Sequence, residues 1–354
     1  MKPLDYLKKL EKFGYEAYIV GGYVRDYLLH INSADIDITT SCRPEELKQL
    51  FDVDGNLGGI KIDDGIYHLD ITTFRKEASY LNHIPRKIKY VKDLKTDLKR
   101  RDFTINSILM NSKGEIIDLL GGKNDLNQHI IRVIGNINKK FKEDPLRMIR
   151  ALRFMITYNY KIEDKALIYI MRHKKLLLKV SDARKKEELD RILLSPNVVN
   201  GMKFLKDMNI LTYLNISYDN LVYTGNITSM WAQIVCLKEF PFTKEENIKI
   251  NSIKKLIKKG SIDAYDIYNY GYEICLLAAK IIGINEEIID ELYSSMKIKK
   301  EEKLAINGKE IMNIINCNNK KIKKIKEDLI YQLVSGNLSN NKDVLMRYIK
   351  KHWK

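Results

Sequence analysis

Two carboxylates stand two residues apart in the segment DIDIT at 35–39. The alternation predicts a strand in which Asp35 and Asp37 project from one face and the two isoleucines from the other, into a core. Like charges this close repel one another, so the pair is costly without a cation. Magnesium prefers carboxylate oxygens together with substrate phosphates, which makes the pair a candidate metal site. The alternative is a solvated edge strand with its acids outward.

A glycine turn precedes this strand. The segment YEAYIV at 15–20 predicts a strand that ends at Gly21 and Gly22, and a short helix follows. Paired glycines let backbone N–H groups approach a phosphate closely, and Arg25 can add a guanidinium. The alternative is a tight turn that needs positive φ, with Arg25 paired to Asp26 or another helix partner. The turn and the acid pair together are more specific than either alone.

The first part of the chain alternates strand-like and helix-like segments. Pro44 followed by EELKQLF predicts a helix with proline near its first turn. The segments 67–74 and 115–119 predict further strands, whereas beyond about residue 141 the pattern is helical almost to the end. We therefore predict an α+β fold, with a mixed α/β head followed by an all-helical remainder.

Composition excludes several classes of protein. The 354 residues are 45% hydrophobic and 31% charged, which excludes intrinsic disorder. No run of about 18 apolar residues indicates a membrane span, and the first residues lack a signal sequence. A formal net charge of +16 favours a polyanionic partner. We expect a cytoplasmic protein, because the four cysteines are scattered without metal-ligand spacing: Cys42, Cys236, Cys275 and Cys317.

The motifs together are similar to a known family. GGYVRDYLL at 21–29 followed by DIDITT at 35–40 resembles the signature of the polymerase-β-like nucleotidyltransferase superfamily. It is most similar to the class II branch, which holds bacterial CCA-adding enzymes and poly(A) polymerases. The resemblance covers essentially the whole chain, because further family motifs follow in order: LDITTFR at 69–75, DLKRRDFTIN at 97–106, DLLGG at 118–122, EDPLRMIRALRF at 143–154 and LAINGKEIM at 304–312.

The resemblance implies a division of the chain into four segments. We expect a catalytic head at 1–140, a nucleotide-specificity neck at 141–200, a helical body at 201–295 and an RNA-binding tail at 296–354. Residues 301–354 hold 12 Lys and Arg against 6 Asp and Glu, which suits an RNA backbone. A solvated basic helix surface is the alternative for this last segment.

The resemblance also implies a third catalytic carboxylate, on the strand before TTFR. Asp70 occupies that position, where a glutamate is more usual in the family. The implied catalytic set is Asp35, Asp37 and Asp70, with Asp35 and Asp37 as ligands of Mg2+.

The motif at 97–106 concentrates groups that suit a nucleotide. Arg101 can hold a triphosphate in a bidentate manner. Asp102 can accept a hydrogen bond from a ribose hydroxyl, and the resemblance makes it the sugar-recognition residue. Asn106 can brace the sugar or the triphosphate. The alternative is two surface basic residues and a helix-capping aspartate.

The motif at 143–154 predicts base selection. Asp144 and Pro145 are typical of an N-cap followed by the first helical residue. Cytosine and adenine both present an amino donor beside a ring-nitrogen acceptor, so Asp144 can accept from the former and Arg147 can donate to the latter. Uracil and guanine would mismatch both contacts. The alternative is an amphipathic helix with a solvated basic stripe. The predicted nucleotide-binding residues are Gly21, Gly22, Arg25, Arg101, Asp102, Asn106, Asp144, Arg147, Arg150 and Arg153.

These expectations converge on a CCA-adding tRNA nucleotidyltransferase that uses CTP and ATP. A CC-adding, A-adding or poly(A) enzyme of the same family is the first alternative, because the base-reading pair is shared. A non-catalytic RNA-binding relative ranks last, because it predicts loss of one of the paired aspartates. Arg184 and Glu188 match a further family helix motif and are expected to pair on one helix face. We expect tRNA as the partner, with no membrane and no obligate protein partner.

Overall fold

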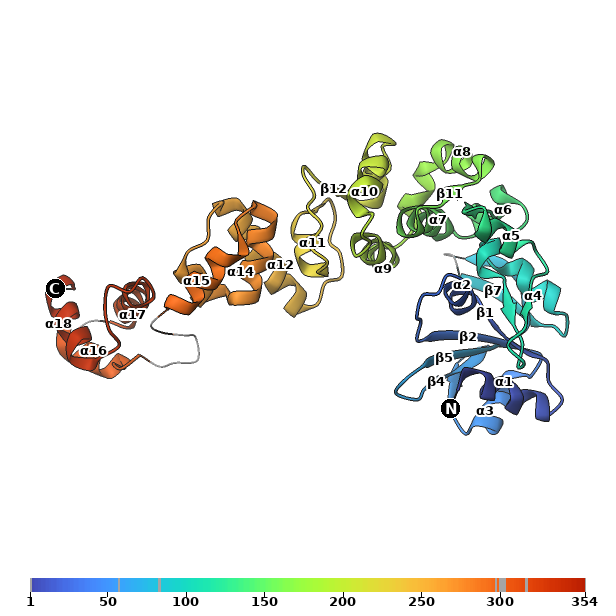
Figure 1. The fold of residues 1–354 in the computed structure, drawn as a ribbon, viewed down its shortest axis with the longest axis horizontal. Coiled ribbons are helices and arrows are strands. Elements are labelled where there is room, and N and C mark those ends of the chain that lie inside the picture. Colours follow the sequence, from blue (N-terminus) through green and yellow to red (C-terminus); the bar gives the residue numbers. More distant parts are fainter. Residues whose placement is uncertain are drawn as a thin grey trace. The chain divides into compact units, whose positions relative to one another are not determined.

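The computed structural model describes residues 2–56, 58–81, 84–296, 298, 304–315 and 318–353. The described residues form two compact units, Met1–Leu214 and Asn215–Lys354 (Figure 1). The finer predicted boundaries at 140, 200 and 295 remain predictions.

A seven-stranded mixed sheet forms the base of the first unit. Neighbouring strands are antiparallel except β2 and β5, which run parallel. The parallel register pairs Asp35 with His68 and Asp37 with Asp70. The predicted acids of two different strands are therefore neighbours. The strand order is β3 (Gly55–Asn56), β4 (Gly59–Asp63), β5 (His68–Thr73), β2 (Asp35–Thr40), β1 (Ala17–Val20), β8 (Leu109–Met110) and β9 (Ile116–Ile117).

The predicted alternation of β2 is confirmed. Ile36 and Ile38 are fully buried, whereas Asp35 and Asp37 lie on the accessible face of the strand. β2 is a central strand, so the alternative of an edge strand is wrong. The acids face outward because that side of the sheet borders a cleft rather than the core.

Short helices cover the sheet. α1 (Pro3–Lys12) and α2 (Gly22–Leu28) contact β1 and β2, and α3 (Pro44–Phe51) contacts β4. The predicted start of α3 is confirmed, with proline in its first turn. A separate hairpin of β6 (Arg75–Leu81) and β7 (Ile84–Tyr90) leads to α4 (Leu94–Arg100). The sequence pattern predicted neither this hairpin nor β4.

The remainder of the first unit is built around α7 (Leu146–Tyr158), which contacts α6, α9 and α10. Its start differs from the prediction by one residue. Pro145 occupies the N-cap, and Asp144 is extended, with φ −146° and ψ 98°. The other elements of this part are η1 (Thr104–Asn106), α5 (Gly122–Asn127), β10 (Ile130–Ile131), α6 (Ile137–Glu143), β11 (Lys161–Ile162), α8 (Asp164–Arg172), η2 (Lys174–Lys179), α9 (Asp182–Leu193), α10 (Val198–Asp207) and η3 (Leu211–Leu214).

Among its described residues, the second unit is helical apart from one pair of two-residue strands, β12 (Ile216–Ser217) and β13 (Val235–Cys236). The α+β prediction is confirmed. The family motif at 304–312 leads into α16. The helices of this unit are α11 (Ile227–Ala232), α12 (Lys244–Lys259), α13 (Ala264–Tyr270), α14 (Tyr272–Ile282), α15 (Glu286–Ser295), α16 (Gly308–Ile315), α17 (Asn319–Val334) and α18 (Lys342–His352).

Two sequence expectations concern the chain as a whole. Among the described residues, no helix is long and apolar enough to cross a membrane. Three of the four cysteines, at positions 42, 236 and 275, are free thiols. Cys317 lies outside the described residues.

Gly122 fixes the main chain that carries the 97–106 motif. A Cβ atom at Gly122 would overlap the backbone oxygen of Thr104, which cannot move without displacing η1. We expect Gly122→Ala to lower the free energy of unfolding by about 1–3 kcal/mol, measured by urea denaturation. Gly22→Ala is the control, since its nearest neighbour would be the flexible end of Arg25 at 3.6 Å. Equal stability of the two variants would contradict this account.

Candidate active site

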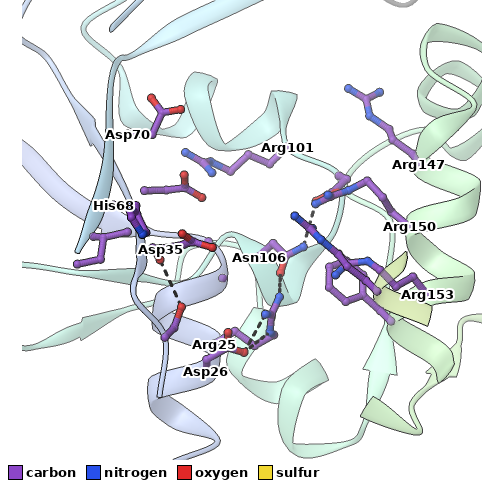
Figure 2. Close-up of a pocket in the computed structure, with 18 of the residues that line it drawn as sticks. Arg25, Asp26, Asp35, His68, Asp70, Arg101, Asn106, Arg147, Arg150 and Arg153 are labelled. Atoms are coloured by element: carbon purple, nitrogen blue, oxygen red, sulfur yellow. Dashed lines mark hydrogen bonds and ion pairs between the residues drawn. The ribbon is translucent and has the colours of Figure 1, made fainter. Parts of the chain in front are cut away.

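The first unit holds an open cleft of about 1110 Å³, bounded by the outer face of β2 and β5, the segment 100–106, α7 and α9. Every residue predicted from the sequence to be catalytic or nucleotide-binding lines this cleft. Figure 2 shows Asp35 and Asp70 on one side, the arginines of α7 on the other, and Arg101 reaching between them toward the acids. The structure therefore brings together predicted residues as far apart in the sequence as Gly21 and Arg153.

The acidic side of the cleft is electrostatically strained. Burial raises the pKa of Asp37, and the negative charges of Asp70 and Asp35 add to the effect, while Arg101 opposes it. Gly21 has φ +85°, and a Cβ there would lie 3.0 Å from Asp37 Oδ2. The glycine turn is thus required both for its backbone conformation and to leave room for the carboxylate.

The paired carboxylates of Asp35 and Asp37 are suitable ligands for a divalent cation. The pKa of Asp37 is raised chiefly by burial and further by the charges of Asp70 and Asp35, and a bound cation would favour the ionised carboxylate. Among the described residues, no group of three or more His, Cys, Asp or Glu side chains could hold a metal ion. Magnesium is commonly held by one or two carboxylates and completes its shell with water and substrate phosphates, so Asp35 and Asp37 stay its predicted ligands. Asp70 neighbours Asp37 in the register of β2 and β5, and its role as a third catalytic carboxylate stays a prediction.

Arg25 is held by protein partners. Its Nε and Nη2 donate to Asp26 Oδ1 at 2.9 and 2.8 Å, and its Nη1 donates to Asn106 Oδ1 at 2.7 Å. The guanidinium also lies over the rings of Phe154 and Tyr158. The sequence left open a pairing of Arg25 with Asp26, and this is the arrangement found. Arg25 lines the cleft, but its role toward phosphate stays a prediction.

Asp97 organises the basic segment, and sequence reasoning assigned it no role. Its fully buried carboxylate accepts hydrogen bonds from Thr39 Oγ1, the Arg75 backbone N–H and Arg100 Nε. Arg101 Nη2 lies 3.6 Å away. Burial alone would raise the pKa of Asp97, but the two arginines keep it below its usual value. The spacing of Asp97 ahead of Arg100 and Arg101 by three and four residues was the available signal.

Arg101 is nearly enclosed between the two sides of the cleft. Burial and the adjacent charge of Arg100 lower its pKa. Its Nε is buried and has no hydrogen-bond partner among the described residues. A guanidinium with unused donors beside Asp37 can bind an anionic group that enters the cleft.

Asp102 is held at both carboxylate oxygens. Oδ1 accepts from the Phe103 backbone N–H and from Asn106 Nδ2, and Oδ2 accepts from Arg150 Nε at 2.6 Å. Although burial opposes ionisation, Arg150 and these hydrogen bonds lower the pKa of Asp102 to about 2. The same pairing raises the pKa of Arg150 against the effect of burial. Asp102 is therefore a fixed anion that accepts but does not donate.

Glu188 of α9 neutralises two arginines of α7. Its carboxylate lies 3.5 Å from Arg150 Nη1 and 2.6 Å from Arg153 Nε, the latter an ion pair without hydrogen-bond alignment. Arg153 also stacks on Phe154, 4.1 Å from the ring centroid to Cζ. Burial and the neighbouring arginines lower the pKa of Arg153 to about 10. The predicted basic stripe is therefore packed against protein, which contradicts the alternative of a solvated face.

The predicted base-reading pair is also engaged. Arg184 donates to Asp144 Oδ1 and Oδ2 at 3.1 and 2.8 Å, and the Leu146 N–H donates to Oδ1. Arg147 donates to the carbonyls of Lys140 and Arg100. The expected pairing of Arg184 with Glu188 is wrong. Arg184 and Glu188 reach different partners because Asp144 lies just before α7, whereas the arginines that pair with Glu188 lie within it.

Both members of the pair retain capacity for a ligand. A guanidinium carries five N–H donors, of which Arg147 uses two in hydrogen bonds. A carboxylate has about four acceptor positions, and three contacts occupy those of Asp144. One acceptor position of Asp144 and several donors of Arg147 therefore remain at the N-terminal end of α7. This combination suits recognition of a planar polar ring.

The cleft thus sets paired carboxylates opposite guanidinium groups around a space large enough for a nucleotide. Comparison with known sequences identifies the family of the chain. The chain is 31% identical to a CCA-adding enzyme of Streptococcus agalactiae, covering 99% of this chain and 96% of that protein. It is 33% identical to a CCA-adding enzyme of Ligilactobacillus salivarius over the same shares. The chain belongs to the family of CCA-adding tRNA nucleotidyltransferases. The resemblance stated from the motifs is confirmed, as is the prediction of an enzyme.

Domain and structure comparisons agree with this family. Residues 17–132 match the poly A polymerase head domain, 159–218 match the "Probable RNA and SrmB-binding site of polymerase A", and 221–349 match tRNA nucleotidyltransferase domain 2. The fold is similar to that of the Bacillus stearothermophilus CCA-adding enzyme solved in complex with CTP. That similarity has a TM-score of 0.86 at 25% identity and covers 99% of this chain and 98% of that one.

The ion pair of Asp102 predicts a pH-dependent stability. Because the pKa of Asp102 falls to about 2 on folding, its ionised form favours the folded state. This contribution is present above about pH 4 and is lost as the pH falls toward about 2, with a magnitude of about 2 kcal/mol. The stability difference between wild type and Asp102→Asn should therefore shrink across this range. Urea unfolding of both proteins at several pH values measures it, and a constant difference would refute the assignment.

Proposed function

We propose that this chain adds the sequence CCA to the 3′ end of tRNA, using CTP and ATP and no nucleic-acid template. The observation that carries the proposal is the cleft itself, in which Asp35 and Asp37 face Arg101, Asp102 and the arginines of α7. Relatives named as CCA-adding enzymes over the full length support the same activity. We propose a cytoplasmic location, which the described free cysteines favour.

The reaction would be an in-line displacement at phosphorus. The 3′-hydroxyl oxygen of the RNA forms a bond to the α-phosphorus of the nucleotide, the bond to pyrophosphate breaks, and the hydroxyl loses its proton. Asp35 and Asp37 would hold magnesium. The chemistry that a bound cation would supply there is a lower pKa of the attacking hydroxyl and neutralisation of charge on the leaving pyrophosphate. The other residues of the cleft bind and orient the two substrates.

Two groups would orient the triphosphate and the ribose of the nucleotide. Arg101 lines the cleft and reaches toward the acids, and its guanidinium suits the triphosphate. Asp102 is an ionised acceptor at neutral pH and would receive a hydrogen bond from a ribose hydroxyl. A deoxyribonucleotide that lacks this donor would leave a buried carboxylate with an unmet contact. Selection of ribonucleotides follows from that mismatch.

Base choice would rest on Asp144 and Arg147. Both lie at the start of α7, on the wall opposite the acids. Their remaining acceptor and donors match the amino group and ring nitrogen that cytosine and adenine share. Protein groups in place of a template explain how one pocket could accept both CTP and ATP. A CC-adding, A-adding or poly(A) enzyme would use the same pair, so product length decides among them.

Incubation of the full chain with tRNA that lacks its 3′ end tests the proposal. We expect two added nucleotides with CTP alone and three with CTP and ATP together, resolved by gel length. Asp37→Ala should reduce incorporation by more than about a hundredfold, because it removes one of two proposed metal ligands. Asp63→Ala is the matched control, since Asp63 lies on the rim of the same cleft and pairs with His68. Full activity of Asp37→Ala would overturn the metal assignment, and long adenylate products would indicate poly(A) synthesis.

Arg147→Ala tests the base-reading pair. The change removes a donor that cytosine and adenine need and that uracil and guanine cannot use. An unmet polar contact costs about 1–3 kcal/mol, so the preference for CTP over UTP should fall about tenfold or more. The measurement is kcat/KM for each nucleotide on tRNA that lacks CCA. A uniform loss of rate with an unchanged CTP to UTP ratio would mean that Arg147 only supports the main chain at 100 and 140.

A further inference from the structure

Lys140 is a buried cation that the chemistry described above does not use. It lies on α6, and only 9% of it is exposed. Its Nζ donates to the backbone oxygens of Lys99 at 2.6 Å and Arg101 at 2.9 Å. Helices leave their last carbonyls without partners, and a cation at that end is favourable. Lys140 thus closes the carboxyl end of α4.

The same stretch of chain holds the neighbouring carbonyls. Arg147 donates to the oxygen of Arg100, and the Ile134 N–H donates to the oxygen of Asp102. Four consecutive carbonyls, 99 through 102, therefore accept from residues between 134 and 147. Arg101 and Asp102, which are proposed to bind the nucleotide, follow the end of α4 at Arg100 and belong to no helix or strand. Their position therefore depends on these hydrogen bonds to the main chain.

Arg147 connects Lys140 to the segment that Lys140 binds. Its Nη1 donates to the carbonyl of Lys140 while its Nη2 reaches Arg100. The side chain proposed to read the base and the side chain of Lys140 thus bind the same three-residue segment, 99–101. A displacement of that segment would move the phosphate-binding, sugar-binding and base-reading groups together.

We propose that Lys140 is a positioning residue that fixes the main chain at 99–101, so that triphosphate, ribose and base are recognised in one register. The inference rests on the proposed function for its substrates, but its geometric part concerns this chain alone. Lys140 touches no substrate in this account and acts through Arg101 and Asp102.

The surroundings of Lys140 make its charge depend on pH near neutrality. Burial and the positive charge of Arg147 lower its pKa to about 8, against opposing effects of Glu143, Asp102 and Glu77. As the pH rises through about 8, the ammonium loses its charge and its hydrogen bonds to the two carbonyls weaken. Nucleotide binding should weaken over the same range.

Lys139 supplies a matched control. It is the preceding residue on α6, its side chain is 75% exposed, and its only ion pair in the described structure is a contact of 3.9 Å with Glu143. We compare wild type, Lys140→Met, Lys140→Arg and Lys139→Met as full chains with magnesium. Binding of radiolabelled CTP and 2′-deoxy-CTP is measured by equilibrium dialysis from pH 7 to 9. Circular dichroism and hydrogen exchange of residues 97–106 accompany it.

We expect Lys140→Met to weaken CTP binding at least tenfold, to reduce the preference for CTP over 2′-deoxy-CTP, and to speed hydrogen exchange at 97–106. Lys139→Met should match wild type. Lys140→Arg should restore most of the affinity and lose the weakening above pH 8. A folded Lys140→Met with wild-type affinity, sugar preference and exchange would overturn the proposal. So would a pH profile that is the same in wild type and Lys140→Arg.

The design separates this inference from the proposed function. Wild type that binds no CTP would refute the proposed function by itself. Hydrogen exchange at 97–106 would still decide whether Lys140 fixes that segment, since that readout needs no nucleotide. If Lys140→Met does not fold, the pH profiles of wild type and Lys140→Arg carry the test.

Discussion

Mutual neutralisation of buried charges is the constraint on which the cleft depends. Arginines gathered for an anionic substrate repel one another, and a buried guanidinium without a partner is costly. The structure answers with a buried carboxylate at each cluster: Asp97 for Arg100 and Arg101, and Glu188 for Arg150 and Arg153. The ion pairs of Glu188 also tie α9 to α7, and the ion pair between Arg150 and Asp102 ties α7 to the segment that follows α4.

The carboxylates on the acidic side of the cleft, in contrast, are not each paired with a buried cation of the described structure. Asp35, Asp37 and Asp70 gather on one face, and burial together with the charges of Asp70 and Asp35 raises the pKa of Asp37 against the effect of Arg101 and Arg150. A protein that stabilised this face with its own lysines or arginines would leave no place for a divalent cation. The strain at Asp37 is thus consistent with a site whose compensating charge arrives with the substrate.

The two walls meet through the main chain between residues 97 and 106. Asp97 holds its beginning, Lys140 and Arg147 hold its middle carbonyls, and Gly122 packs against its end at Thr104. Such support lets a segment without regular structure present Arg101 and Asp102 as firmly as a strand presents Asp35. The proposed positioning role of Lys140 rests on this support.

The sequence by itself determined the strand with paired acids, the glycine turn, the α+β order and the family, because these depend on local alternation and on motifs read in order. It identified the residues of the cleft but not their partners. Whether Arg25 paired with Asp26, whether Arg184 reached Glu188 or Asp144, and what Asp97 and Lys140 do were decided only by tertiary structure. A charged side chain selects its partner by distance and burial across elements, and spacing along one helix or strand does not contain that information.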